Sequence, residues 1–253
     1  MDTLAPVIDR VSPCRRPASK LAGFHRWTDL LFIHWRLPAE TVAPLLPPEL
    51  SLDTWEGDAW VGLVPFHMSG VRPWWSPWGA SFLETNVRTY VHSRGRGPGV
   101  WFFSLEANHR LAVRIARARW RLNYHWAEMN FVRQGELLHY ESRRRASPGE
   151  RTRIVARLRG PGTSTPFHAQ AGTLEHFLVE RYLLYAGGHS GKLWRGQVYH
   201  RPYLVQPAEL LESEESLLAV NQIRTCDPPC HVLYSARVDV EVFPLVPLAT
   251  DLW

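Results

Sequence analysis

Lysine and cysteine are scarce in this sequence. Among its 253 residues 29 are basic, yet only Lys20 and Lys192 are lysines, and all the others are arginines. Arginine favours planar, bidentate contacts with anions, whereas nonspecific nucleic-acid binders typically carry many lysines. The three cysteines are an odd number in a chain of this length, so no disulfide framework is expected. The net charge of +5 therefore indicates no particular partner by itself.

Long hydrophobic runs are also missing. No segment approaches the roughly 20 apolar residues that cross a membrane as a helix, and the N-terminus has no basic segment followed by an apolar run. We expect a cytoplasmic protein with no membrane partner. The chain is 45% hydrophobic and shows no shift in composition, which predicts one large core. Early prolines predict a flexible tail over residues 1–22, followed by a single domain over residues 23–253.

Hydrophobic periodicity predicts many strands separated by a few helices. Alternation or short apolar runs predict strands at 27–36, 59–68, 82–92, 100–106, 136–143, 151–159, 194–199 and 231–243. Helical spacing predicts helices at 38–46, 107–121, 174–185 and 208–219. In the second helix Leu111, Ile115 and Ala118 share an apolar face, opposite a stripe of arginines at 110, 114, 117 and 121. We expect an α+β fold with a mostly antiparallel sheet that curls or closes and helices packed outside it.

One predicted strand carries a row of polar side chains. With period two, Glu84, Asn86 and Arg88 lie on one face of the strand at 82–92, followed by Tyr90 and His92. A carboxyl, an amide and a guanidinium on one face suit the binding of a small polar molecule. Glu84 and Arg88 could equally form an ion pair that only stabilises the strand, because they lie two registers apart on the same face.

Several segments, in order along the chain, resemble the YqjF-like domain of unknown function. They are residues 32–36 followed by a short helix, Leu46-Pro-Pro-Glu-Leu50, Gly57-Asp-Ala-Trp-Val-Gly-Leu-Val-Pro-Phe66, residues 82–91 and 99–105, and Ala116-Arg117 leading to Tyr124 and Met129. The resemblance covers residues 24–243. It implies an acetoacetate decarboxylase-like fold, which is a closed β-barrel or cone with flanking helices and a small-molecule cavity inside.

The resemblance also implies site residues. The decarboxylases of this superfamily form a Schiff base between a lysine and a β-keto acid, and a second lysine lowers the pKa of the first. By order and spacing, Glu84 corresponds to a glutamate that lines their cavity, and Arg117 to an arginine before the lysine segment. The lysine positions fall at Asn123, Tyr124 and His125. The resemblance therefore does not carry imine chemistry over to this chain.

These residues lead to a main hypothesis and an enzymatic alternative. The main hypothesis is a pocket inside the barrel that binds a small polar or carboxylate-bearing molecule and needs no cofactor. Its predicted ligand-binding residues are Arg88, Asn86, His67 and Arg117. The alternative is a lyase or hydratase-like enzyme acting on a small oxo acid without an imine. In that enzyme Glu84 is the general acid or base, and Tyr124 or His67 donates a hydrogen bond to a developing oxyanion.

Three further patterns are weaker. The arginine stripe together with residues 143–145 suggests a second alternative, binding of an anion or nucleic acid, although a charged stripe opposite an apolar face is usually solvated. Cys226, Cys230 and His231 lack the fourth ligand of a zinc site, so no metal is expected. Lys192 follows glycines but lacks the hydroxyl residue of a phosphate-binding loop. The sequence leaves open whether the protein forms homo-oligomers and whether Lys192 reaches the pocket.

Overall fold

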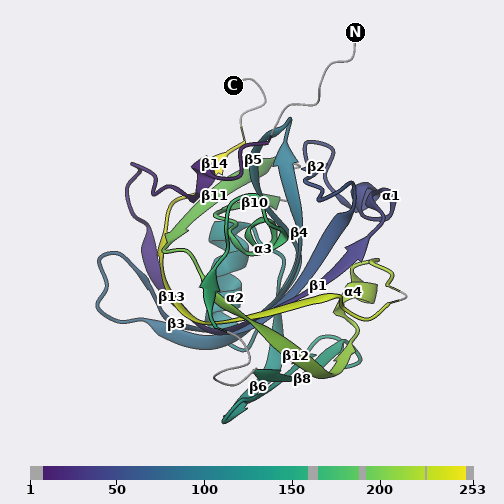
Figure 1. Ribbon diagram of the computed structural model, residues 1–253. Helices are drawn as coiled ribbons and strands as arrows, with labels where there is room; N and C mark the ends of the chain where they lie inside the picture. The colour runs from purple at the N-terminus through teal and green to yellow at the C-terminus, as the bar shows by residue number, and fades with distance from the viewer. Residues whose placement is uncertain (1–7, 159–164, 188–191, 226, 249–253) are drawn as a thin grey trace.

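The computed structural model describes residues 8–158, 165–187, 192–225 and 227–248, and strands dominate it (Figure 1). The strands are β1 (Gly23–Leu37), β2 (Ser51–Leu52), β3 (Ala59–Pro73), β4 (Ala80–Ser93), β5 (Arg96–Ala107), β6 (Tyr124–Gln134), β7 (Leu137–Arg144), β8 (Arg151–Leu158), β9 (Phe167–His168), β10 (Leu183–Gly187), β11 (Leu193–His200), β12 (Leu204–Glu215), β13 (His231–Val242) and β14 (Val246–Pro247). The helices are α1 (Ala39–Val42), α2 (Arg110–Ile115), α3 (Leu174–Val179) and α4 (Leu217–Val220). Short 3-10 turns cover Ser12–Cys14 and Ala43–Leu45, and a π turn at Ala116–Trp120 continues α2.

The strand pairings form a closed circuit, here called the main circuit. β5 pairs with β4, β4 with β3, β3 with β1, β1 with β13, β13 with β11, β11 with β10, and β10 again with β5. A second path leaves β5 through β6, β7, β8 and β12 and rejoins the main circuit at β13. These pairs are antiparallel except β10 with β5 and β5 with β6. The described chain is thus a mostly antiparallel sheet with a few short helices, as the sequence predicted.

One core lies on the face of β1, β3 and β4 that carries Glu84, here called the Glu84 face. Phe32, Phe66 and Tyr90 pack there with Val113 of α2 and Phe177 of α3. In Figure 1, α2 and α3 appear in the middle of the view. Both helices contribute side chains to the core on the Glu84 face.

A second core lies on the opposite face of the same strands, here called the Val87 face. Ile33, Leu63 and Val87 form one buried cluster with Leu138 of β7 and Ile154 of β8. Strands β1, β3 and β4 are therefore covered on both sides. This double burial accounts for their nearly continuous apolar runs.

An irregularity in β1 decides which side chains lie on the Glu84 face. Asp29 has a positive φ of 51°, and the pairing of β1 with β3 shifts register between Thr28 and Ile33. Such a bulge adds one residue to a strand. As a result Trp27 and Leu30 both pack in the core of the Glu84 face. Simple alternation would have put them on opposite faces.

Two of the predicted helices differ from the structure: the one at 174–185 is helical only in its first half, and the one at 208–219 is mostly a strand. At 174–185, α3 is followed by β10, and at 208–219, β12 runs on until α4 begins. Leucine spacing at 208–219 suits a helix, but β12 pairs with β8, and its glutamates meet arginines across the ladder. The ion pairs are Glu209–Arg157, Glu212–Arg153 and Glu214–Arg151. Cross-strand pairing therefore overrides the local pattern.

The helix predicted at 107–121 forms, but its buried side differs from the predicted one. Leu111 and Ile115 are 58% and 49% exposed, whereas Val113 is buried. The residues of this segment that pack against the core are Ala112, Val113, Ala116 and Trp120. Ala112 and Val113 precede the π turn that begins at Ala116, so the packing side already differs from the predicted one within α2. The face formed by Leu111, Ile115 and Ala118 is therefore not the packing face.

Residues 8–22 run along the strands. The side-chain amide of Gln197 on β11 donates to the carbonyls of Pro13 and Arg15, and the N–H of Ala22 donates to the carbonyl of Val242. The rest of the predicted tail, residues 1–7, lies outside the described residues, as do residues 188–191 before Lys192, and Cys226.

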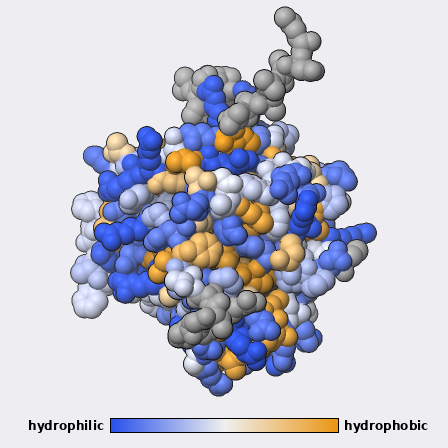
Figure 2. All heavy atoms as spheres, viewed as in Figure 1, coloured by the Kyte–Doolittle hydropathy of each residue, from blue (hydrophilic) through white to orange (hydrophobic). Residues whose placement is uncertain are grey.

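On the face seen in Figure 2, hydrophilic side chains cover much of the surface, with hydrophobic ones gathered between them. Among the described residues, the most exposed large apolar side chains include Trp74, Trp75 and Trp78, which connect β3 to β4. No helix in the described ranges is long and apolar enough to cross a membrane.

Candidate functional site

The polar row predicted at 82–92 lies on β4 and is buried. Glu84, Asn86 and Arg88 are 3%, 4% and 8% exposed. Tyr90 belongs to the core of the Glu84 face, while Val87 belongs to the core of the opposite face. The structure therefore brings three predicted site residues together on one face, as period two requires.

Glu84 pairs with Tyr124, the other residue predicted to be catalytic. The Tyr124 O–H donates to Glu84 Oε2 at 2.5 Å. Burial raises the pKa of Glu84 to about 7, although hydrogen bonds from Tyr124 and Asn86 act to lower it, and the carboxyl of Glu106 adds to the rise. Burial and the Glu84 carboxylate raise the pKa of Tyr124 well above its ordinary value. Near neutral pH Glu84 can thus give or take a proton, while Tyr124 remains a hydrogen-bond donor.

The end of the α2 segment brings Tyr124 to Glu84. Arg121, with a positive φ of 54°, ends the π turn, and β6 then begins at Tyr124 beside Leu105 of β5. Arg117 Nε donates to the Tyr124 carbonyl at 2.6 Å, and Arg117 is exposed. The predicted ligand residue Arg117 thus holds the backbone of Tyr124 from an exposed position.

Arg88 and Tyr90 share one acceptor on α3. Arg88 Nη2 donates to the Leu178 carbonyl at 3.1 Å, and the Tyr90 O–H donates to it at 2.9 Å. Since that hydroxyl has one proton, Tyr90 accepts the 2.9 Å hydrogen bond from His34 Nε2. His34 Nδ1 then accepts from His231 Nδ1 at 3.1 Å. Burial lowers the pKa of both histidines, which agrees with this neutral chain.

Two buried polar atoms of the row have no hydrogen-bond partner, Asn86 Oδ1 and Arg88 Nε. An unpartnered buried polar group costs about 1–3 kcal/mol, so such atoms are expected to meet a ligand or water. Gly62 on β3 lets the His34 ring and the stem of Arg88 pack closely against this strand, because a Cβ there would lie 3.2 Å from His34 and 3.5 Å from Arg88. The row therefore offers one free acceptor and one free donor on the face of β4 that carries the Glu84 carboxyl.

Two other predicted features lie away from the row. His67 is half-buried between Phe66 and Met68, which both pack on the Glu84 face, so its side chain points to the opposite face of β3. The structure does not bring His67 to the row. Both lysines, Lys20 and Lys192, are exposed.

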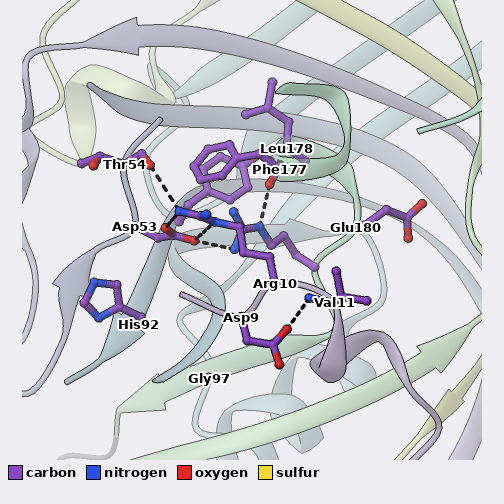
Figure 3. Close-up of polar contacts among 12 residues, drawn as sticks. Asp9, Arg10, Val11, Asp53, Thr54, His92, Gly97, Phe177, Leu178 and Glu180 are labelled. Atoms are coloured by element: carbon purple, nitrogen blue, oxygen red, sulfur yellow. Dashed lines mark hydrogen bonds and ion pairs between the residues drawn. The ribbon is translucent and has the colours of Figure 1, made fainter. Parts of the chain in front are cut away.

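A second polar cluster, which the sequence did not predict, lies at α3. The buried Asp53 accepts hydrogen bonds from Arg10 Nη2 at 2.5 Å and from Arg181 Nη1 at 2.7 Å (Figure 3). Arg181 Nε also donates to the Phe177 carbonyl at 2.6 Å, and both guanidiniums lie against the Phe177 ring. The partners of Asp53 are 43 and 128 residues away in sequence. No local pattern could therefore have revealed them.

Three arginines of β7 and β8 lie in an open groove of mixed charge. Arginines and glutamates line it together, namely Arg143, Arg151, Arg153, Glu128, Glu141 and Glu214. Arg143 pairs with Glu128 at 3.1 Å, and Arg151 pairs with Glu214 at 3.3 Å. The groove is not a uniformly positive surface. Within the described ranges, no group of three or more His, Cys, Asp and Glu side chains is placed to hold a metal ion.

Solved structures of the same fold indicate the class to which this arrangement belongs. The acetoacetate decarboxylase of Legionella pneumophila matches with a TM-score of 0.62 at 14% identity, over 98% of each chain. The enduracididine biosynthesis enzyme MppR, complexed with the condensation product of pyruvate and imidazole 4-carboxaldehyde, matches with a TM-score of 0.62 at 10% identity, over 100% of each chain. An acetoacetate decarboxylase-like enzyme from Sphingomonas wittichii RW1 matches with a TM-score of 0.61 at 10% identity, over 96% of this chain and 99% of the other chain. The chain therefore has the acetoacetate decarboxylase-like fold.

Sequence comparison identifies the family within that fold. The family model DUF2071, "Uncharacterized conserved protein", matches residues 25–239. The uncharacterized protein YqjF of Bacillus subtilis (strain 168) is 35% identical over 224 residues, which is 87% of this chain and 89% of YqjF. The chain belongs to the DUF2071 family. This result confirms the resemblance to the YqjF-like domain.

Proposed function

We propose that Glu84, Asn86 and Arg88 line a pocket that binds a small polar molecule bearing a carboxylate, without a Schiff-base lysine. One observation carries the proposal: Arg88 Nε and Asn86 Oδ1 are buried without partners on the face of β4 that carries the Glu84–Tyr124 pair. A planar guanidinium matches the geometry of a carboxylate. MppR, which has the same fold, has been solved in complex with pyruvate, and this supports a small carboxylate as the ligand.

We also infer that the main circuit closes into a barrel or cone around this pocket. Each of its strands is paired on both sides within the circuit. The polar row lies on the face that packs against α2 and α3. A closed sheet has no free edge, and a pocket shielded from water makes the attraction between Arg88 and a carboxylate stronger.

The binding proposal is tested with Arg88→Met and a set of small mono- and dicarboxylic acids. Arg237→Met is the matched control, because Arg237 is an exposed arginine that pairs with Asp239 at 2.9 Å. We expect at least one acid to bind the wild type in calorimetry and to lose about tenfold or more in affinity with Arg88→Met. Arg237→Met is expected to bind like the wild type. Binding of no acid, or equal affinity for both variants, would contradict the proposal.

The absence of an imine is tested separately. Borohydride added together with a bound oxo acid such as pyruvate is expected to leave the protein mass unchanged, because both lysines are exposed. A stable adduct on Lys192 would overturn this part of the proposal and leave the pocket itself in place.

The Glu84–Tyr124 pair supports acid/base catalysis on a small oxo acid, of lyase or hydratase-like type, as a second candidate. A pKa of about 7 lets Glu84 take the proton that leaves the substrate and return it in the next step. The Tyr124 O–H, which now donates to Glu84 at 2.5 Å, would donate to the substrate oxygen that gains negative charge. Arg88 would hold the carboxylate.

Catalysis is tested by following pyruvate, acetoacetate and related oxo acids by NMR. Glu84→Gln is expected to abolish any turnover but to keep binding, since the amide preserves the shape of the carboxyl. Tyr124→Phe is expected to lower kcat by about 10²-fold or more. Turnover that survives Glu84→Gln would rule out this mechanism.

Binding of an anion or nucleic acid through the arginine stripe at 110, 114, 117 and 121 together with residues 143–145 is the remaining alternative. At residues 143–145 all three arginines pair with acids: Arg143 and Arg145 pair with Glu128, and Arg144 pairs with Glu106. Salt-sensitive retention on heparin would favour it. A cytoplasmic location and homo-oligomers also stay predictions, to be checked by cell fractionation and by light scattering of the purified protein.

A further inference from the structure

Five ring nitrogens on described strands of the main circuit are buried without a hydrogen-bond partner. Three of them, His25 Nδ1, Trp27 Nε1 and His200 Nε2, lie on β1 and β11 near β13. His25 pairs with Val240 on β13, and Val240 pairs with His200 on β11, so one cross-strand row carries both histidines. Trp27 and Val240 pack in the core of the Glu84 face. The rings of Trp27 and His200 lie 6.0 Å apart. We call these three side chains the ring-nitrogen cluster.

Each nitrogen of the cluster has a defined hydrogen-bonding capacity. His200 Nδ1 lies 2.7 Å from the Arg201 carbonyl and must donate to it, which leaves Nε2 as an acceptor. Trp27 Nε1 can only donate. Burial lowers the pKa of His25 and of His200 to about 4, so both rings are neutral at physiological pH. The cluster therefore offers at least one donor and one acceptor but no charge.

Aromatic rings connect the cluster to the polar row. Tyr182 stacks on His200 at 4.3 Å with an interplanar angle of 18°, and Tyr203 lies 4.4 Å from His200. Tyr203 in turn contacts Phe32 at 5.3 Å, and the Arg88 guanidinium lies 5.5 Å from the Phe32 ring. A chain of ring contacts thus connects the cluster to Arg88. Aromatic rings pack well against flat groups.

We propose that the ring-nitrogen cluster binds a neutral heteroaromatic ring of the same ligand whose carboxylate meets Arg88. The inference rests on the proposed function and narrows the ligand class from small carboxylates in general to heteroaryl acids. Arg88 supplies the charge, and the cluster recognises a planar group with one donor and one acceptor. A hydrocarbon ring would leave the nitrogens of Trp27 and His200 unpartnered and would bind more weakly.

A pair of matched acids tests the proposal. In 3-(1H-pyrazol-4-yl)propanoate the neutral ring has one donor and one acceptor, whereas 3-phenylpropanoate is of similar size and has neither. In calorimetry near neutral pH we expect the pyrazole acid to bind the wild type about tenfold more tightly or better. Trp27→Phe and His200→Phe keep a ring but remove one partner, so each is expected to abolish most of this preference.

His139→Phe is the matched control, because His139 Nε2 is also buried without a partner but lies on β7, outside the main circuit. This variant is expected to retain the full preference for the pyrazole acid. Thermal unfolding of each variant separates loss of binding from loss of fold.

The outcomes also separate this inference from the proposed function. If both acids bind the wild type equally and Arg88→Met weakens both, the cluster holds water and the inference fails, while the carboxylate pocket stands. A neutral probe without a carboxylate, 4-methylpyrazole, reports on the cluster alone. Suppose that this probe binds the wild type but not Trp27→Phe, and that neither acid binds. That result would support ring binding at the cluster and overturn the carboxylate pocket. Binding of none of the three probes overturns both.

Discussion

Glu84 is a carboxyl whose charge the fold disfavours. It is 3% exposed, and burial raises its pKa from 4.5 to about 7. The native state therefore binds this proton more tightly than the unfolded chain does. The contribution of Glu84 to stability is fully present below pH 4.5 and is lost as the pH rises through 7. Buried groups with strongly shifted pKa values gather at functional sites, which agrees with a place for Glu84 in the proposed pocket.

Replacing Glu84 by Gln should flatten part of the pH dependence of stability. Between pH 4.5 and 7, ionisation of Glu84 is expected to lower the unfolding free energy of the wild type by roughly 3 kcal/mol. Glu84→Gln is expected to show no such loss, because the amide does not ionise. The measurement is the free energy of unfolding by urea at a series of pH values. Burial lowers the pKa of His25 and His200, so their contribution to stability increases as the pH rises. Both histidines are present in the variant and in the wild type, so the difference in unfolding free energy between the two proteins reports on Glu84.

Glu128→Gln provides the control for this titration. Its carboxylate pairs with Arg143 and Arg145, and its side chain is 42% exposed. If the unfolding free energies of Glu84→Gln and the wild type changed with pH in parallel, Glu84 would be ionised in the native protein. The acid/base role would then lose its basis.

At the scale of elements, α3 is held from two sides. The Leu178 carbonyl accepts hydrogen bonds from Arg88 and Tyr90 on β4, which belong to the polar row. The preceding residue, Phe177, lies against Arg10 and Arg181, which both pair with Asp53. The N-terminal segment that carries Arg10 is thus connected to the candidate site through one short helix.

Substitutions in this cluster should follow the burial of the charges. Asp53→Asn leaves the buried Arg181 without its carboxylate and is expected to cost about 3–5 kcal/mol of unfolding free energy. Arg10→Met is expected to cost only about 1 kcal/mol, because Arg10 is 28% exposed and Asp53 keeps Arg181. Denaturant unfolding measures both values.

Arg16→Met serves as the reference for this series. Arg16 also lies in the N-terminal segment, but its side chain is 50% exposed and pairs with Glu241 on the surface. A cost below about 1 kcal/mol is expected. If Asp53→Asn were no more destabilising than Arg16→Met, the cluster at α3 would not anchor the helix.

At the scale of the whole molecule, two cores share the same strands. β1, β3 and β4 carry one core on the Glu84 face and the other on the Val87 face. The second path of strands also starts and ends on members of the main circuit. Neither core can lose its strands without exposing the other.

Unfolding should therefore be a single cooperative transition despite the length of the chain. Tryptophan fluorescence and far-UV circular dichroism are expected to give the same urea midpoint. Ile154→Ala, on β8 in the second core, should shift both curves equally and cost about 2–5 kcal/mol. Two separated midpoints would show that the path through β6, β7 and β8 unfolds on its own.

Period two was enough to place the polar row. Glu84, Asn86 and Arg88 share a face of β4 because side chains alternate along any strand, whatever surrounds it. The same rule puts His67 on the face opposite Phe66, but it does not say which face of β3 meets the row. That choice depends on the pairing of β3 with β4, which brings Phe66 opposite Glu84.

Local pattern failed where distant partners decide the structure. Glu209 and its neighbours have helical spacing, yet arginines on β8 make this segment a strand. The ring-nitrogen cluster depends on the bulge at Asp29 and on three strands far apart in sequence. Neither feature can be predicted from a short window of sequence.

The sequence by itself determined the family, the mostly antiparallel sheet, the faces of β4 and the lack of a lysine at 123–125. These follow from residue identity and from the geometry of a single strand. Only the tertiary structure decided that Tyr124 reaches Glu84, that α3 receives Arg88, and that Asp53 joins two arginines. The physical reason is that burial and pairing between distant segments set these contacts, and both arise only when the whole chain has folded.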